Sequence, residues 1–216
     1  GVSISSFLFG MTAVLVVQFI SRRVRSQPVM GLILSGIMIG SLFSSATSFI
    51  KLVADPNNVL PQITYWLMGS LASIRPRDLL FAAVPIFCGI VPLFLLRWRL
   101  NVLTLGEEEA RSIGINTRLL RAVVIFCATL MTAASVSISG MIGWVGLVIP
   151  HFTRMLVGCD YRVSLPASML LGASFLVVVD NFSRLLTTSE IPLGILTAYV
   201  GAPFFLYLIL REGKKI

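Results

Sequence analysis

The sequence predicts an all-α protein: a polytopic bundle of about seven transmembrane helices, with a short external helix and a pair of short helices in a cytoplasmic loop. Hydrophobic residues make up 56% of the 216 residues and charged residues only 12%, whereas soluble domains carry about 25% charged residues. So little charge cannot cover a surface exposed to water, and we therefore expect lipid to be the outer solvent. The apolar runs are continuous rather than alternating, which excludes membrane-spanning β-strands.

Seven apolar runs approach the length that crosses a bilayer as a helix, which is about 20 residues, or about 17 at the short end. In chain order they cover residues 4–20, 29–50, 79–96, 119–138, 141–156, 165–182 and 191–210. The fifth run is the shortest of the seven. Its glycines at 143 and 146, with Gly140 directly before it and Pro150 within it, predict a bent or closely packed helix. An eighth run, residues 63–72, is too short to span and is expected to form an interfacial or re-entrant helix.

The loop charges orient these helices. Thirteen of the 17 Lys and Arg residues fall on one side if the helices alternate, and the positive-inside rule assigns that side, with the C-terminus, to the cytoplasm. Lys51, Arg75, Arg77 and Arg184 are then external. The net charge of +8 does not indicate nucleic-acid binding, because the cations punctuate apolar runs instead of gathering on one polar face. We expect a multi-pass protein of the cell (inner) membrane, surrounded by lipid.

The sequence shows no pattern of an enzyme or a metal site. It has a single histidine, His151, no HExxH pattern and no P-loop, so we expect no catalytic residue, no bound metal and no cofactor. Asp180 lies near the end of the sixth run, where a charge is costly unless it is paired or hydrated. An ion-coupled secondary transporter needs ionisable groups within the membrane, and Asp180 alone is thin support for this alternative.

The segment LGEEEARSIGINTRLLR, residues 105–121, is a compact charged stretch between apolar runs. Its Glu, Ala and Arg residues favour a helix that Gly114 would end, and Asn116 is suited to cap a second helix. Two short helices joined by a glycine turn would form a rigid projection on the cytoplasmic side. An ordinary solvated loop has no need for this pattern, so we interpret the segment as a docking element for a cytosolic partner.

Several stretches resemble the FecCD-type permeases, which are subunits of ABC importers for iron chelates, haem and vitamin B12. They are the LGEEEARSIGIN segment, the stretch SGMIGWVGLVIPHF that begins at Ser139, and EIPLGILTAYVGAPFFLYLIL near the C-terminus. The stretch YWLMGSL, residues 65–71, resembles the short external helix of that family. The resemblance extends over essentially all of residues 1–216, which we expect to form a single transmembrane permease domain containing the coupling loop 105–121.

The resemblance also implies an assembly. Permeases of the family have ten helices, so the seven runs would correspond to helices four to ten, with three preceding helices missing from this sequence. Two permease copies form a homodimer around a central pathway, two cytosolic ABC ATPase subunits drive it, and a periplasmic or lipoprotein substrate-binding protein caps the outer face. The chain is then a transport subunit and not an enzyme. An iron siderophore is the favoured cargo, with haem, cobalamin and molybdate-type oxyanions as alternatives.

The predicted site residues form four groups. The resemblance assigns ATPase coupling to Glu107, Glu108, Glu109, Ala110, Arg111, Ser112 and Gly114, and places Tyr65, Trp66 and Gly69 at an external gate. It assigns contact with the binding protein to Arg184, for which a pair with Asp180 or Glu190 is an equal alternative. The small residues of the second run, including the G-x-x-x-G of Gly36 and Gly40, indicate either tight helix packing or a hydrated pathway. In the second case Ser35, Ser41 and Ser45 line it, with Ser41 and Ser45 on one helix face.

Overall fold

The computed structural model describes residues 2–21, 23, 28–72, 74–104, 106–186 and 190–212. Within these ranges the chain forms nine helices and no strand: α1 (Val2–Ser21), α2 (Pro28–Val53), α3 (Val59–Met68), α4 (Pro76–Leu103), α5 (Glu107–Ser112), α6 (Thr117–Ser139), α7 (Val145–Val157), α8 (Tyr161–Leu185) and α9 (Leu193–Glu212). Five of them, α1, α2, α4, α6 and α8, are long and apolar enough to cross a membrane. The predicted all-α, multi-pass membrane architecture is confirmed.

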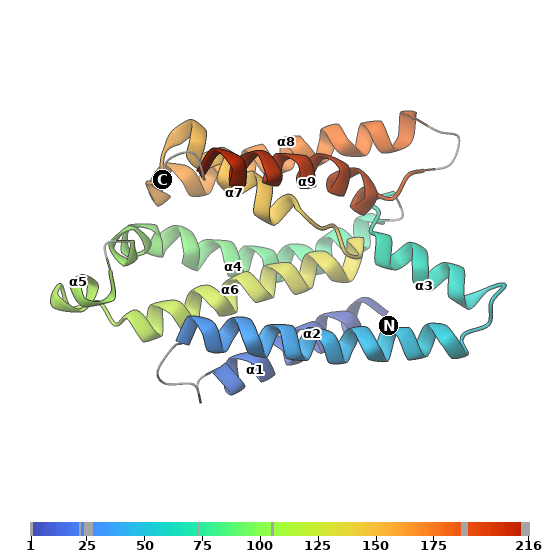
Figure 1. Cartoon of the computed structure of the whole chain (residues 1–216), viewed down its shortest axis with the longest axis horizontal. Coiled ribbons are helices and arrows are strands. Elements are labelled where there is room, and N and C mark those ends of the chain that lie inside the picture. The colour runs from blue at the N-terminus through green and yellow to red at the C-terminus, as the bar shows by residue number, and fades with distance from the viewer. Residues whose placement is uncertain are drawn as a thin grey trace.

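The long helices lie roughly along one common direction, and the two shortest helices, α3 and α5, lie at the ends (Figure 1). α6 packs between α1 and α4, and α2 packs on α1. α8 packs on α4, and α7 and α9 pack on α8 and on each other. α5 projects at one end of the bundle, and α3 lies toward the opposite end. Along the chain, the connections between the long helices in Figure 1 lie alternately at the α5 end and at the α3 end, as expected from the predicted alternation.

Small residues make the contact between the two central helices. A Cβ atom on Gly89 of α4 would lie 2.9 Å from the Cys127 carbonyl oxygen of α6, so only glycine allows this approach. Ala133 and Ala134 of α6 are also buried. Large apolar side chains point outward instead, and Leu95, for example, is 78% exposed. Small residues inside and large apolar residues outside suit a bundle whose surroundings are lipid.

Two short helices differ from their predicted positions. The helix predicted over residues 63–72 occupies Val59–Met68, because Gly69 ends it with a φ of 72°. The helix predicted over residues 141–156 begins only at Val145, so this predicted start is wrong. Gly140 and Trp144 have φ values of 69° and 67°, and such left-handed conformations interrupt a right-handed helix. The 13 residues of α7 span about 20 Å, less than the roughly 30 Å of a bilayer core.

Candidate functional site

The charged loop forms a short helix that projects from one end of the bundle (Figure 1). α5 contacts α4 and α6, and its end is closed by two backbone hydrogen bonds. The Gly114 N–H donates to the Arg111 carbonyl at 2.9 Å, and the Ile115 N–H donates to the Ala110 carbonyl at 3.0 Å. With Gly114 at a φ of 83°, this is a Schellman motif. The predicted helix, glycine turn and second helix are all present.

The second helix of the loop begins as predicted. The Asn116 side-chain oxygen accepts a hydrogen bond from the Leu119 N–H at 3.1 Å and so caps α6. This bond satisfies one of the N–H groups that a helix start leaves without a partner inside the helix. Gly114 and Asn116 together fix where one short helix ends and the next begins.

The side chains of α5 divide into an anchor and an exposed surface. Ala110 is fully buried, whereas Glu109, Arg111 and Ser112 are exposed. Ser112 donates its hydroxyl to the Glu109 carbonyl at 2.7 Å, within the loop itself. Glu107 and Glu108 form the first turn of α5; their side chains, and Leu105, lie outside the described part of the chain. The role of these residues in coupling stays a prediction.

The carboxyl end of α3 is fastened to two distant segments through a glycine junction, which we define as Gly69, Gly140 and Gly194. A Cβ on Gly69 would lie 2.7 Å from the Met141 carbonyl oxygen, and one on Gly140 would overlap the Trp66 carbonyl oxygen. A Cβ on Gly194 would lie 2.5 Å from the Met68 carbonyl oxygen. Three backbones thus approach more closely than any residue with a side chain would allow.

Two backbone hydrogen bonds complete the junction. The Leu193 N–H donates to the Gly69 carbonyl at 2.9 Å, and the Ser70 N–H donates to the Ser139 carbonyl at 2.8 Å. They join α3 to the start of α9 and to the end of α6. This junction was not predicted from the sequence. Its only signal was that each of the three glycines lies at a helix end, and that signal does not show which helix ends meet.

The predicted gate residues lie around a large groove beside α3. Tyr65 and Trp66 are 66% and 39% exposed, and both line a space of about 1180 Å³. The rest of its lining comes from other residues of α3, from Ser70 and Ala72 after it, from the end of α6, and from the segment before α9 with Ile195. Gly69 is buried and belongs to the glycine junction, so it positions α3 and does not itself face the groove.

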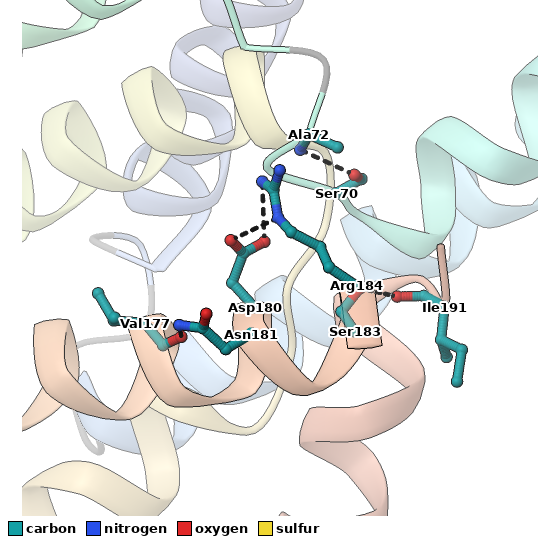
Figure 2. A network of polar contacts seen from close by, with 8 residues as sticks. All are labelled: Ser70, Ala72, Val177, Asp180, Asn181, Ser183, Arg184 and Ile191. Atoms are coloured by element: carbon teal, nitrogen blue, oxygen red, sulfur yellow. Dashed lines mark hydrogen bonds and ion pairs between the residues drawn. The ribbon is translucent and has the colours of Figure 1, made fainter. Parts of the chain in front are cut away.

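Arg184 is paired within the chain. Its Nε donates to Asp180 Oδ2 at 2.9 Å and a terminal nitrogen donates to Asp180 Oδ1 at 3.3 Å, as Figure 2 shows. The Arg184 side chain nevertheless remains 47% exposed. Arginine has five N–H donors, so the pair with Asp180 leaves donors available to a partner. Of the two intramolecular alternatives, the one with Asp180 is found.

The end of α8 that carries Arg184 is held by its neighbour in sequence. The buried Ser183 donates its hydroxyl to the Ile191 carbonyl at 2.5 Å, and the Ile191 N–H donates to the Ser183 carbonyl at 3.3 Å. These bonds connect the end of α8 to the segment before α9. In Figure 2 the Arg184 guanidinium extends toward the turn of Ser70 and Ala72, which follows α3.

The three predicted pathway serines do not share one environment. Ser35 is only 4% exposed, and its hydroxyl donates to the Gly31 carbonyl at 2.6 Å and lies 3.4 Å from the Val17 carbonyl of α1. Ser35 thus faces α1 and not an open surface. Ser41 and Ser45 are exposed, and their role in lining a pathway stays a prediction.

The G-x-x-x-G of α2 has no close partner in the described part of the chain. No heavy atom lies within 4 Å of a Cβ built on Gly36 or Gly40. The contacts of α2 are with α1, on the side where Ser35 lies. The tight packing that this motif often makes is therefore not found within these residues, and the face of α2 around Gly40, Ser41 and Ser45 remains open.

Comparison with known proteins agrees with this architecture. A family model described as the FecCD transport family matches residues 1–211. The chain is 42% identical to the molybdate import system permease protein MolB of Haemophilus influenzae, over all of this chain and 65% of that protein. It is 41% identical to a probable iron chelatin transport system permease protein of Helicobacter pylori, over 88% of this chain and 58% of that one. It thus spans less than two thirds of the length of either relative.

A solved structure shows the same fold. It is described as an inward-facing conformation of a metal-chelate type ABC transporter, and it superposes with a TM-score of 0.88 at 42% sequence identity. The superposition covers 95% of this chain and 65% of the other. With a family match over nearly the whole chain, two relatives above 40% identity and a shared helical bundle, the chain belongs to the FecCD transport family.

Proposed function

We propose that the chain forms part of the translocation pathway of a binding-protein-dependent ABC importer. Residues 1–216 act as one transmembrane permease domain, and ATP is hydrolysed by a separate subunit. The observation that carries this proposal is α5, a charged helix closed by Gly114 that projects beyond the ends of the membrane helices. A bundle that only fills a membrane has no use for such an element, whereas a pathway driven by a cytosolic motor needs a rigid contact with it.

The coupling surface in this proposal is the loop 105–121. Its polar side chains are those of Glu107, Glu108, Glu109, Arg111 and Ser112. Ala110 anchors α5 in the bundle, and Gly114 forms the turn that ends this helix. Because Ala110 is fully buried, a push on α5 is passed to α4 and α6, which it contacts. Closure of two ATPase subunits would thereby move the membrane helices.

The distribution of cations supports the orientation. Among the described residues, the helix ends on the side of α5 carry eight of these cations: Arg23, Arg97, Arg99, Arg111, Arg118, Arg121, Arg154 and Arg162. The helix ends on the side of α3 carry four: Lys51, Arg75, Arg77 and Arg184. By the positive-inside rule, the α5 end and the C-terminus are cytoplasmic. The α3 end then faces the substrate-binding protein, and the protein resides in the cell (inner) membrane.

The pathway lies between two copies of the permease in a homodimer. The exposed face of α2 supports this arrangement, because Ser41 and Ser45 lie there beside Gly36 and Gly40, which have no close contact within the described chain. The external gate is the end of α3 with Tyr65 and Trp66. Arg184, which keeps an exposed guanidinium beside Asp180, contacts an acidic group of the binding protein.

The cargo in this proposal is a metal chelate, with an iron siderophore favoured over haem, cobalamin or a molybdate-type oxyanion. The groove beside α3 supports a bulky and largely apolar cargo. Among the described residues that line it, Glu190 is the one with a charged side chain, and the others are mostly apolar or carry a hydroxyl or amide. A small oxyanion binds best to cationic hydrogen-bond donors, and the described lining of this groove contains no Lys or Arg side chain.

Reconstitution tests the proposal. The full-length permease, its ATPase and its binding protein in proteoliposomes should import a ferric siderophore at the expense of ATP, and the loaded binding protein should stimulate ATP hydrolysis. Uptake that follows an ion gradient and does not require ATP would contradict the proposal and favour a secondary transporter. Calorimetric titration of the binding protein with a ferric siderophore, haem, cobalamin and molybdate identifies the cargo separately.

A further inference from the structure

The last turn of α4 is joined to the first turn of α8 by a set of hydrogen bonds, which we call the α4–α8 clasp. Asn101 supplies both ends of its side-chain amide. Its nitrogen donates to Asp160 Oδ1 at 2.5 Å, and its oxygen accepts from the Tyr161 N–H at 2.7 Å. Arg97, one turn earlier on α4, donates to the Arg162 carbonyl at 3.4 Å. The clasp thus links residues that are about 60 positions apart in the chain.

Asp160 has two separate tasks in the clasp. The Oδ1 atom that accepts from Asn101 also accepts from the Arg162 N–H at 2.8 Å and so caps α8. The bond from the Arg162 N–H, followed by that from the Asn101 amide, lowers the pKa of Asp160 below its ordinary value, so the side chain is ionised at neutral pH. The capping bond is local to α8, whereas the bond to Asn101 reaches another helix. The capping task does not require Asn101.

The position of the clasp connects it with the coupling loop. Asn101 lies in the last turn of α4, and its carbonyl accepts from the Thr104 N–H at 3.1 Å and from the Thr104 hydroxyl at 2.6 Å. Only residues 104–106 separate α4 from α5. A displacement of α5 therefore acts first on the turn of α4 that the clasp holds. α5 reaches α6 directly through Gly114 and Asn116, and the clasp joins the last turn of α4, next to α5, to the start of α8.

α8 runs from the clasp to the opposite end of the bundle. It has 25 residues and is therefore about 37 Å long, with Asp160 before its first turn and Arg184 in its last. It packs against α4, α7 and α9, so an axial or tilting movement at one end is passed to the other. The exposed setting of Asp160 and Arg162 means that the clasp bonds compete with water and add little to stability.

We infer that Asn101 and Asp160 are positioning residues that transmit the movement of α5 to α8. This inference rests on the proposed function, because it takes α5 as the contact with the ATPase. It adds a second route to the one through α6, and it gives α8 the task of linking the cytoplasmic coupling loop to the external end that carries Arg184.

Substitutions at Asp160 separate transmission from helix capping. Asp160→Ser keeps a good capping residue, but its shorter side chain cannot reach Asn101, so the bond from the Asn101 amide nitrogen is lost while α8 stays capped. Asp160→Asn keeps an oxygen that can accept both bonds, so the clasp and the cap survive. Asn101→Ala removes both bonds that Asn101 makes to the start of α8. Arg99→Ala removes an exposed side chain from the same part of α4 and serves as the matched control.

The measurement is the amount of cargo imported per ATP hydrolysed by the complete transporter in proteoliposomes, together with the thermal unfolding midpoint. Asp160→Ser and Asn101→Ala should lower this ratio about fivefold, the lower end of measured couplings between sites, with an unchanged midpoint. Asp160→Asn and Arg99→Ala should retain the wild-type ratio.

Two results would overturn the inference: a wild-type ratio in Asp160→Ser and Asn101→Ala, or an equal loss in Asp160→Asn. If instead the wild-type complex shows no ATP-driven uptake, the proposed function itself fails. The wild-type measurement therefore distinguishes the failure of the clasp from the failure of the transporter assignment.

Discussion

Gly114 permits a test of the coupling loop in which only the preferred backbone conformation changes. Its φ is 83°, and no heavy atom lies within 4 Å of the position that a Cβ would take. A side chain there meets no steric obstacle, so the cost of a substitution comes from the backbone. That cost is about 1–2 kcal/mol for an ordinary L-residue in the left-handed region and is least tolerable for a β-branched residue, whereas asparagine adopts this region comparatively readily.

We expect Gly114→Val to uncouple ATP hydrolysis from uptake. A change of about 1–2 kcal/mol alters the equilibrium between loop conformations by a factor of about 5–30. α5 has six residues, and helices shorter than about 12 residues are marginal by themselves, so this helix depends on the two Schellman bonds that Gly114 positions. The membrane helices do not depend on those bonds and should remain folded.

The assay compares Gly114→Val with Gly114→Asn in the reconstituted transporter. Both substitutions add a branched side chain of similar size to the same open space, but only asparagine suits the observed φ. Cargo imported per ATP should fall about fivefold or more in the valine variant and stay near the wild-type value in the asparagine variant. Wild-type transport by Gly114→Val would refute the reasoning, and so would an equal loss in both variants.

Three further predictions concern the other predicted sites. Arg184→Glu should slow association of the loaded binding protein about tenfold at low ionic strength and less at high salt, because charges at an interface act mainly on the association rate and are screened by salt. Ser41→Cys and Ser45→Cys should react with aqueous thiol reagents to an extent that depends on the nucleotide state. Gly140→Ala should lower stability by about 2–4 kcal/mol, measured as a lower midpoint of thermal unfolding, because the new Cβ overlaps the Trp66 carbonyl oxygen at a positive φ.

Each of these has a control within the chain. Asp180→Asn leaves Arg184 in place and removes its acidic partner, so association should be as fast as in the wild type or faster; a slower rate would show that the pair is structural. Ser35→Cys should stay unreactive because Ser35 is buried, and protection of all three cysteines in every state would indicate packing. Gly143 has open space around it, so Gly143→Ala should keep the midpoint that Gly140→Ala lowers; equal midpoints would contradict the role of the junction.

Local and compositional features were predicted well from the sequence. The scarcity of charge indicated lipid surroundings, and five helices of membrane length are present. The end of α5 at Gly114 and the start of α6 at Asn116 were also correct, because a glycine in the left-handed region and an asparagine cap act within a few residues of their own positions. Features of this kind depend on neighbours in the chain, and the sequence contains them directly.

Contacts between distant segments were decided by the tertiary structure. Nothing in the local sequence shows that Gly69, Gly140 and Gly194 meet, or that Asn101 bonds to a residue 59 positions later. The late start of α7 has the same origin. The left-handed conformation of Trp144 is unfavourable by itself, and it occurs where a Cβ on Gly201 of α9 would lie 2.6 Å from the Trp144 Cβ. The residue types determine that the bundle is surrounded by lipid and where its short helices end. Only the packing of the helices determines which helix ends touch, because those contacts depend on the relative positions of whole elements.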